Sequence, residues 1–317
     1  MSKILITGVA GFIGSSTAKK LIKNHTIVGL DNFNNYYDPK IKEENIKFLK
    51  KNKKFILYRD DILDRKKIFD IFKKNKPDIV IHLAAMCGVR SSLQQEDIYY
   101  KTNVTGTRNI LDAAKNVKIK QIIFSSSSSV YGDSIPSPFD ESANNLIQKN
   151  PYGKSKYLAE KICYEYTKRY NLPILIFRFF TVYGPHGRPD MAPYIFTTAV
   201  KNGKIITQYG NGDSERDYTY ISDIVDGINL AIRKKTINQI INLGNSKSIK
   251  LSTFISLIEK ITLKKAKVKV LPRNKYEMKK TLANIQKAKA ELGWKPKIST
   301  KEGLKRLSKW MDDESIT

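Results

Sequence analysis

Several residue types that carry chemistry in other proteins are scarce in this sequence. Its 317 residues include two cysteines, Cys87 and Cys163, and three histidines, His25, His82 and His186. Two cysteines cannot build a disulfide framework, and the histidines lack metal-ligand spacing, so we expect a reducing cytoplasm and no bound metal. No run approaches the roughly 20 apolar residues of a membrane span, and the first apolar strand begins too early for a signal peptide. We therefore expect no membrane segment.

Acidic residues are also few relative to basic ones. The chain has 57 lysines and arginines against 30 aspartates and glutamates, which gives a formal net charge of +27. Such a charge permits binding to nucleic acid or to other anionic surfaces. However, the lysines are spread over the whole chain, and no nucleic-acid-binding motif accompanies them. We expect no nucleic-acid partner, while an attraction for phosphorylated substrates is compatible with the charge.

A glycine-rich loop lies near the N-terminus between a predicted strand and a predicted helix. The apolar run 3–7 is typical of a buried parallel strand, and residues 15–23 read as a helix. Between them, Gly8, Gly11 and Gly14 permit a tight turn and a close approach of the backbone to a pyrophosphate, whose charge the helix N-terminus favours. An ordinary glycine turn is the alternative, but the strand–loop–helix context favours a dinucleotide site that includes Phe12 and Ile13.

A carboxylate at the end of the second predicted strand indicates which dinucleotide binds. The run 26–31 ends in Asp31. An acid at this place hydrogen-bonds the adenosine ribose hydroxyls and repels a 2′-phosphate. The sequence therefore favours NAD over NADP.

Strands and helices alternate through the first two-thirds of the chain, which predicts an α/β fold with a Rossmann-type doubly wound parallel sheet. Further strands are expected at 55–59, 79–83, 121–125 and 173–177, and helices at 41–51, 65–74, 97–115 and 155–170. Later, short strands at 205–208, 240–243 and 268–271 mix with helices at 224–233, 253–261 and 300–311. We place an NAD-binding domain at 1–184 and a smaller, partly interleaved α/β substrate lobe at 185–317.

Tyr152 and Lys156 are the candidate catalytic pair, because residues four apart share one face of a helix. A phenol is a poor base at neutral pH, but a nearby ammonium and a positive nicotinamide lower its pKa. The serine run 125–129 follows a strand, and one of its hydroxyls can share the proton taken from a substrate alcohol. A solvated helix face and a flexible turn are the alternatives, which the dinucleotide loop upstream disfavours.

These motifs resemble those of the extended short-chain dehydrogenases/reductases that modify nucleotide sugars, and in motif the chain is most similar to UDP-glucuronate 4-epimerases. The resemblance covers essentially the whole chain. Its segments are 31–39 (DNFNNYYDP), 83–85 (LAA), 88–90 (GVR), 178–185 (RFFTVYGP), 187–192 (GRPDMA) and 292–296 (LGWKP).

The resemblance implies that tightly held NAD oxidises a UDP-hexose at C4, and that the transient 4-keto sugar turns over and is reduced on its other face. Tyr152 would be the base, Lys156 its partner and ribose ligand, and Ser127 the proton-sharing hydroxyl. A cytoplasmic homodimer is also expected.

The resemblance further assigns ligand contacts. The cofactor would touch Asn32, Asp61, Ile62, Leu83, Ala84 and Ala85, with Asp61 and Ile62 at the adenine. The UDP-sugar would touch Cys87 and Arg90, with Arg216 and Arg273 clamping the diphosphate and Tyr209 against the uracil. Ser128, Ser129, Thr181 and Arg188 would hold a sugar carboxylate.

Some positions depart from the epimerase pattern. Met86-Cys87 stands where that family usually has Gln-Ala, Ser91 replaces a tyrosine, and His186 replaces a tryptophan. Cys87 is either a small apolar filler or a thiol that transfers a proton. The second interpretation keeps open a 4,6-dehydratase, for example on UDP-N-acetylglucosamine, possibly with 5-epimerisation. However, Ser128 and Ser129 replace the acid–base pair of the usual dehydratase. A non-catalytic NAD-binding sensor is a remote alternative.

Overall fold

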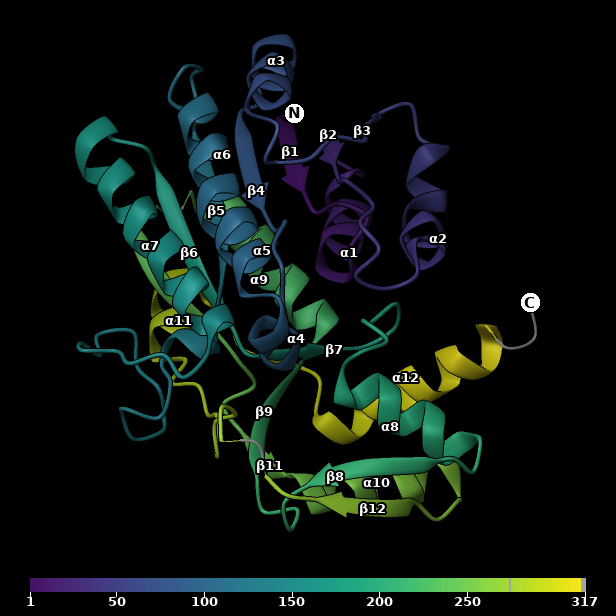
Figure 1. Ribbon diagram of the computed structural model, residues 1–317. Coiled ribbons are helices and arrows are strands. Elements are labelled where there is room, and N and C mark those ends of the chain that lie inside the picture. The colour runs from purple at the N-terminus through teal and green to yellow at the C-terminus, as the bar shows by residue number, and fades with distance from the viewer. Residues whose placement is uncertain (236, 274, 315–317) are drawn as a thin grey trace.

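The centre of the protein is a parallel sheet that contains a switch in strand order. The computed structural model describes residues 1–235, 237–273 and 275–314, and Figure 1 shows the sheet in the upper part of the molecule. Its order is β10-β6-β5-β4-β1-β2-β3. Its strands are β1 (Lys3–Thr7), β2 (Thr26–Leu30), β3 (Phe55–Tyr58), β4 (Ile79–His82), β5 (Gln121–Ser127), β6 (Ile174–Phe179) and β10 (Gln239–Leu243). The predicted doubly wound parallel sheet is confirmed, and its switch point lies between β1 and β4, where such sheets bind ligands.

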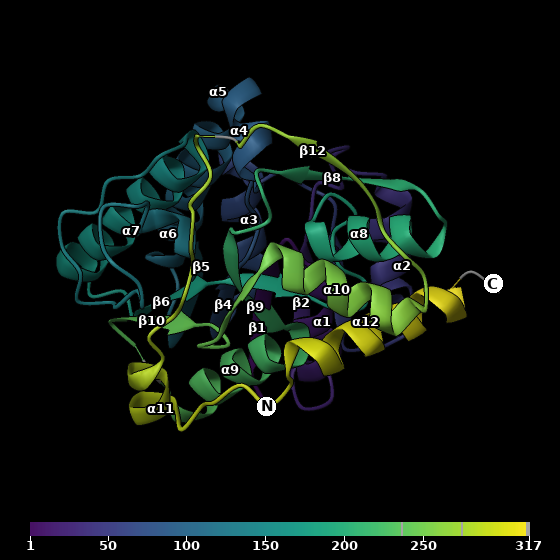
Figure 2. The same cartoon turned by 90° about the horizontal axis from the view of Figure 1, so that it is seen from below.

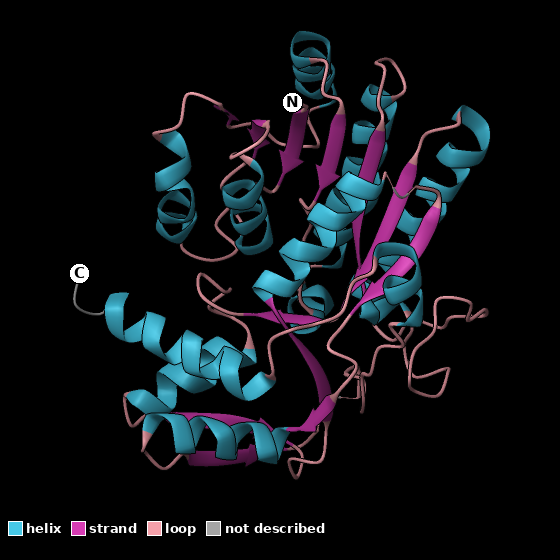
Figure 3. Ribbon diagram, turned by 180° about the vertical axis from the view of Figure 1, so that it is seen from behind, coloured by secondary structure: helices cyan, strands magenta, loops and turns pink. Residues whose placement is uncertain are grey.

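Helices cover both faces of this sheet, because successive strand residues point to opposite sides (Figures 1 and 3). In β1, Ile4 and Ile6 pack into one apolar cluster, and Leu5 packs into the other. The first face carries α1 (Phe12–Leu21), α2 (Pro39–Lys50), α9 (Ile221–Lys234) and α11 (Gln286–Leu292). The second carries α3 (Arg65–Asn75), α6 (Thr107–Ala114) and α7 (Pro151–Tyr170).

The predicted helix 97–115 is present, with a π-helical turn in its middle. The chain forms α5 (Glu96–Tyr100), the π-helical turn (Lys101–Gly106) and then α6 without a gap. The Asn103 side chain explains this wider turn, because its amide accepts from the Met86 backbone N–H at 2.8 Å and donates to the Met86 carbonyl at 3.0 Å. It also donates to Ser155 Oγ at 2.9 Å. Wider turns of this kind often occur at functional sites, and this one ties the segment after β4 to α7.

Helix α7 begins earlier than residue 155, the predicted start. Pro151 occupies its first turn, and the Asn150 side chain caps it by accepting from the Gly153 N–H at 2.9 Å. Proline fits the first turn because it has no N–H to leave unpaired. Tyr152 therefore lies inside the helix, one turn before Lys156.

A smaller lobe lies below the sheet in Figure 1, and Figure 2 shows it from beneath. A three-stranded and a two-stranded sheet pack here against helices around their own apolar cluster. The strands are β7 (Thr181–Tyr183), β9 (Glu215–Tyr220) and β11 (Ser248–Lys250), then β8 (Ile205–Tyr209) and β12 (Lys267–Leu271). The helices are α8 (Ala192–Lys201), α10 (Leu251–Thr262) and α12 (Thr300–Glu314).

The strand predicted at 240–243 was wrongly placed among the short strands of the smaller lobe. It is β10, the edge strand of the main sheet, where Asn242 is the register partner of Arg178 in β6. The chain thus returns to the main sheet after entering the smaller lobe, and the domain boundary at residue 184 stays a prediction. Within the described residues, no helix is long and apolar enough to span a bilayer.

Candidate active site

The glycine loop after β1 packs directly against the segment after β4. A Cβ on Gly14 would lie 2.0 Å from the Gly8 carbonyl oxygen, and one on Gly8, whose φ is +71°, would lie 2.8 Å from the Ala84 backbone nitrogen. Only glycine fits these positions, so backbone alone faces the cavity beside them. Helix α1 begins at Phe12, with its N-terminus at this cavity.

One cavity of about 840 Å³ runs from the glycine loop to the smaller lobe. It is lined by every predicted site residue except Asp61 and Arg273. The Asp61 carboxylate accepts from Asn32 Nδ2 at 2.8 Å and from the Leu63 N–H at 2.8 Å, while its neighbours Asp60 and Ile62 line the cavity. Arg273 instead lies 4.0 Å from a carboxylate oxygen of Asp213. The structure therefore brings together residues from distant parts of the chain but leaves these two side chains outside.

The Asp31 carboxylate lies at the cavity edge where β2 ends. One oxygen accepts from the Ala10 N–H at 3.0 Å and the other from the Phe33 N–H at 2.9 Å. Burial raises the pKa of Asp31, and these two hydrogen bonds oppose the rise. Its two amide contacts fix the carboxylate beside the glycine loop, in the place expected for a ribose ligand.

Tyr152 and Lys156 face the cavity from the first two turns of α7. Burial lowers the pKa of Lys156, whose ammonium lies 4.6 Å from the centre of the Phe124 ring. Burial also raises the pKa of Tyr152, an effect that Cys87 strengthens and that hydrogen bonding to Ser127 opposes. The motif predicted a lowered pKa for the Tyr152 phenol, whereas in the protein without its ligands burial outweighs the groups that lower this pKa.

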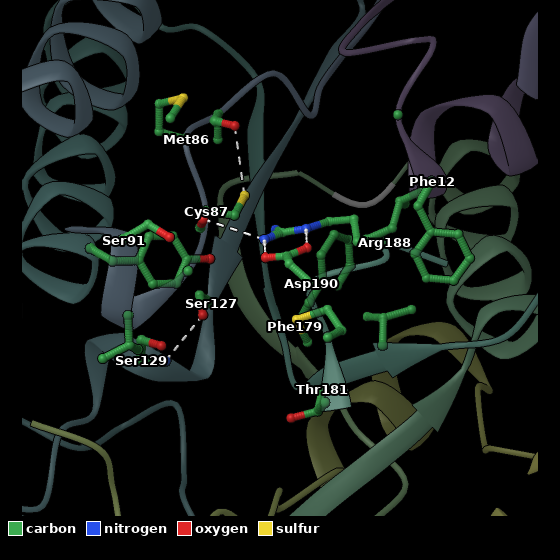
Figure 4. A pocket seen from close by; sticks show the side chains of 18 of the residues that line it. Phe12, Met86, Cys87, Ser91, Ser127, Ser129, Phe179, Thr181, Arg188 and Asp190 are labelled. Atoms are coloured by element: carbon green, nitrogen blue, oxygen red, sulfur yellow. Dashed lines mark hydrogen bonds and ion pairs between the residues drawn. The ribbon is translucent and has the colours of Figure 1, made fainter. Parts of the chain in front are cut away.

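The serine run is part of the rigid structure. Ser127 ends β5, and its hydroxyl accepts from the Ser129 N–H at 3.1 Å in the single helical turn that follows (Figure 4). Ser127, Ser128 and Ser129 are all buried, yet they line the cavity. A Cβ on Gly153 would lie 2.6 Å from the Ser129 carbonyl oxygen, so α7 approaches this turn closely. The alternative of a flexible turn is therefore wrong.

Arg188 enters the same cavity from the loop after β7. Its Nε donates to Asp190 Oδ1 at 2.9 Å and its Nη2 to Asp190 Oδ2 at 2.5 Å, and Nη2 is also 3.4 Å from the Cys87 carbonyl oxygen (Figure 4). The Tyr36 hydroxyl contacts Asp190 Oδ2 at 3.2 Å and Ser91 Oγ at 2.9 Å. Asp190 and Tyr36 were not predicted as site residues, although both lie in segments that carry the family resemblance.

A second group of side chains lies where the main sheet meets the smaller lobe. The Arg90 guanidinium lies 3.9 Å from the centre of the Tyr209 ring, and its Nε donates to Glu277 Oε1 at 2.7 Å. The other Glu277 oxygen is 3.9 Å from an Arg216 nitrogen. Glu277, which was not predicted from the sequence, thus lies between Arg90, a predicted UDP-sugar contact, and Arg216, a predicted diphosphate ligand.

Cys87 and His186 have different surroundings. The Cys87 thiol lines the cavity, 3.7 Å from the Ala85 carbonyl oxygen. The His186 ring packs 5.1 Å from the Trp310 ring, and burial lowers its pKa to about 4. His186 does not line the cavity, so it is not placed to exchange a proton with a ligand there. Within the described part of the chain, no three potential ligands gather into a metal site.

Comparison with known protein families and solved structures identifies the family to which this chain belongs. The model described as GDP-mannose 4,6 dehydratase matches residues 5–307. The chain belongs to this family of extended short-chain dehydrogenases/reductases. A UDP-glucuronate 4-epimerase of Thermodesulfobacterium geofontis is 40% identical over 312 residues, which cover 98% of this chain and 96% of that protein. The uncharacterized protein MJ1055 of Methanocaldococcus jannaschii is 42% identical over 310 residues, or 97% of this chain and 95% of that protein.

Solved structures of this family agree along the whole chain. The UDP-glucuronic acid 4-epimerase of Bacillus cereus, in complex with UDP-glucuronic acid and NAD, has a TM-score of 0.94 and 36% identity, covering 98% of this chain and 99% of that one. The UDP-glucose 4-epimerase of Thermotoga maritima has a TM-score of 0.90 and 30% identity, covering 99% of both chains. The family predicted from the motifs is therefore confirmed.

Proposed function

We propose that this protein is an NAD-dependent UDP-sugar 4-epimerase whose main substrate is UDP-glucuronate. The observation that carries the proposal is the position of Tyr152, Lys156 and Ser127 in one cavity with the glycine loop, at the switch point of the sheet. The UDP-glucuronate 4-epimerases among its relatives, one of them solved with NAD, support this choice.

The residues at the switch point fit a dinucleotide. The cradle formed by Gly8 and Gly14, which any Cβ would fill, and the N-terminus of α1 would receive the pyrophosphate. Asp31 would hold the adenosine ribose, with Ile62 near the adenine. When bound, NAD supplies the acceptor for the hydride from sugar C4 and returns that hydride to the opposite face.

The protein's own contribution is to move one proton reversibly. Tyr152 would take the proton of the C4 hydroxyl, with Ser127 sharing it, and would give it back after the keto sugar has turned over. Burial raises the pKa of Tyr152, so its phenolate must be stabilised by positive charge. The Lys156 ammonium, one turn along α7, provides such a charge and would also bind the nicotinamide ribose.

The remaining cavity residues would orient the substrate. Arg216 and Arg90 would bind the diphosphate, and Tyr209 would contact the uracil. At the other end, Ser128, Ser129, Thr181 and Arg188 would hold the C6 carboxylate. Asp190 engages Nε and Nη2 of Arg188, which leaves Nη1 to reach a sugar carboxylate.

A dehydratase is the second candidate, favoured by one observation. The Cys87 thiol lines the cavity, and it contributes to the electrostatic environment of Tyr152. After oxidation at C4, proton transfer by this thiol would assist loss of water across C5 and C6. Return of the same hydride to C6 and of a proton to C5 would then give a 6-deoxy-4-keto sugar from UDP-N-acetylglucosamine. UDP-glucuronate has no C6 hydroxyl to lose and would be inert to this reaction.

Product analysis by NMR decides between the two. The purified enzyme is incubated separately with UDP-glucuronate, UDP-glucose and UDP-N-acetylglucosamine. The epimerase proposal predicts UDP-galacturonate from the first substrate at the highest rate. A product with a new methyl signal from UDP-N-acetylglucosamine, together with inert UDP-glucuronate, would overturn it in favour of the dehydratase. Turnover of any of the three would dismiss a non-catalytic sensor.

We also propose a homodimer in the cytoplasm. Ile98 on α5 and Leu158 and Tyr164 on α7 are exposed on neighbouring helices, and a second copy of this surface would bury them. Cys87 and Cys163 are both free, in keeping with a reducing compartment. Light scattering should give twice the chain mass for the wild type and a lower mass for Leu158→Glu with Tyr164→Glu; a monomeric wild type would contradict the proposal.

A further inference from the structure

A row of buried polar side chains crosses the main sheet next to the catalytic serine. Ser126 in β5, Arg178 in β6 and Asn242 in β10 are register partners on adjacent strands. Glu160 reaches them from α7: it accepts from Ser126 Oγ at 2.5 Å, from Arg178 Nε at 3.0 Å and from Arg178 Nη2 at 2.7 Å. The Arg178 and Glu160 side chains are only 3% and 5% exposed.

The row continues on the far side of Arg178. The guanidinium lies 4.7 Å from the centre of the Tyr131 ring, and the Tyr131 hydroxyl donates to Asn242 Oδ1 at 2.8 Å. Asn242 Nδ2 in turn donates to the Phe139 carbonyl at 2.9 Å. The network therefore links α7 to three strands and to the segment before α7.

Stability alone does not account for this ion pair. Taking two charges out of water carries a large desolvation cost, and apolar residues of similar volume are often equally or more stabilising in such places. The pair is also imperfectly satisfied, because Arg178 Nη1 is buried and has no hydrogen-bond partner among the described residues. Because burying the Glu160–Arg178 pair carries this desolvation cost, we infer that the pair has a role that apolar side chains could not fill.

The position of Glu160 suggests that role. Tyr152, Lys156 and Glu160 follow one another at intervals of four residues on one face of α7. The Glu160 carboxylate holds Ser126, which directly precedes Ser127. One side chain thus joins the helix that carries the proposed base to the strand that carries the proposed proton-sharing hydroxyl.

We propose that Glu160 is a positioning residue that locks α7 to β5 and places a negative charge one helical turn from Lys156. The proposal rests on the function assigned above to Tyr152, Lys156 and Ser127. Glu160 does not line the cavity and would act only through these neighbours.

The groups around Lys156 support a charge effect of Glu160. Burial lowers the pKa of Lys156, and Cys87, Cys163 and Glu160 oppose this. From β4, His82 faces Lys156 as a neutral ring, since burial lowers its pKa to about 3. Tyr152 on α7 and the Phe124 ring on β5 complete the surroundings. Burial raises the pKa of the Cys163 thiol, so this thiol carries no charge near neutral pH. Among the groups named here, Glu160 is the carboxylate.

The central experiment is the pH profile of kcat for Glu160→Gln, a substitution of nearly equal size that removes the charge. We expect kcat near neutral pH to fall about 3- to 30-fold, and the alkaline limb of the profile to move to lower pH because Lys156 loses its proton more easily. Substrate KM and NAD binding should change less than twofold. The control is Glu165→Gln, at an exposed position of the same helix, which should match the wild type.

A second variant separates position from charge. Ser126→Ala removes one hydroxyl and leaves the Glu160–Arg178 pair intact, so we expect a lower kcat with an unmoved alkaline limb. If the alkaline limb of the kcat profile does not move in Glu160→Gln, the proposed charge effect on Lys156 is wrong. If Glu160→Gln does not fold, a wild-type kcat in Ser126→Ala would overturn the positioning role. Wild-type turnover by Tyr152→Phe would instead mean that the underlying function assignment has failed.

Discussion

At the scale of single residues, each proposed role depends on a side chain that the surrounding structure already holds in place. Tyr152 has the Tyr99 ring at 6.2 Å, edge to face, and the Tyr99 hydroxyl donates to the Cys87 carbonyl at 2.8 Å. Arg188 is held by both oxygens of Asp190. Groups fixed in this way lose little entropy when a substrate arrives, which is what a site for acid–base chemistry needs.

The phenol of Tyr152 is the proposed base, and its removal is the first test. Tyr152→Phe should lower turnover of UDP-glucuronate by at least about 100-fold, the usual scale of acid–base contributions. UDP binding should persist, because Arg216 and Arg90 are unchanged. Single-turnover kinetics and calorimetric titration with UDP measure the two effects. Substantial residual turnover would show that another group is the base.

Arg188 should determine the preference for an acidic sugar. Arg188→Ala removes a cation from the proposed carboxylate site, and a charge-assisted hydrogen bond contributes more than a neutral one. We expect affinity for UDP-glucuronate to fall about 10- to 100-fold, whereas UDP-glucose should lose less than about threefold. Titration of both ligands into Tyr152→Phe, with and without Arg188→Ala, avoids turnover during the measurement. An equal loss for both ligands would contradict this role.

Asp31 should select the cofactor. Its carboxylate is fixed at the cavity by the Ala10 and Phe33 amides, where a 2′-phosphate would meet a second negative charge. We expect NAD to bind at least about tenfold more tightly than NADP, as measured by quenching of protein fluorescence. Equal affinity for the two dinucleotides would show that Asp31 does not face the ribose.

At the scale of elements, the parts that the sequence predicted are those with local signals. Tyr152, Lys156 and the glycine loop lie within short motifs, so their spacing was sufficient to predict their grouping. The contacts that were missed join distant segments: Tyr36 with Asp190, and Arg90 with Glu277. The hydrophobic periodicity of the sequence cannot predict such contacts, because they form only when helices and strands from distant segments pack together.

Two features of the elements were not predicted from the sequence, and both have physical causes. The π-helical turn between α5 and α6 depends on the side chain of Asn103, whose partners Met86 and Ser155 lie in other segments. Strand β9 reads ERDYTY, which lacks a run of aliphatic residues, yet its tyrosines Tyr218 and Tyr220 are buried in the smaller lobe. Both the π-helical turn and strand β9 are therefore determined by tertiary contacts rather than by local sequence preference.

His82 connects β4 with β1 and α6, and it should make this junction sensitive to acid. Its ring lies between Thr7 Oγ1 at 2.7 Å and Thr107 Oγ1 at 3.0 Å. Burial lowers its pKa from 6.5 to about 3, so the unfolded chain binds a proton before the folded chain does. The stabilisation is full above pH 6.5 and is lost as the pH falls toward the folded value, by about 3 kcal/mol between about pH 6.5 and pH 4.

Urea unfolding at several pH values tests this coupling. The difference in unfolding free energy between wild type and His82→Gln should shrink as the pH is lowered from 7 to 4, because the variant has no proton to gain. A difference that stays constant over this range would show that His82 titrates normally in the folded protein.

At the scale of the whole molecule, the switch point explains why one cavity serves both ligands. The loops after β1 and β4 meet there, and the smaller lobe covers the same end of the sheet (Figure 1). The cofactor loop, the candidate uridine-diphosphate residues and Tyr152 thus line one cavity. Fold and family followed from the sequence, while the Asp190, Glu277 and Glu160 contacts required the structure.

The central claim is that the hydride removed from C4 stays on the enzyme and returns to the same carbon. Conversion of UDP-glucuronate in D₂O, followed by proton NMR of the product, tests this most directly. The account predicts UDP-galacturonate that carries protium at both C4 and C5. Deuterium at either carbon, or a product without inversion at C4, would contradict it.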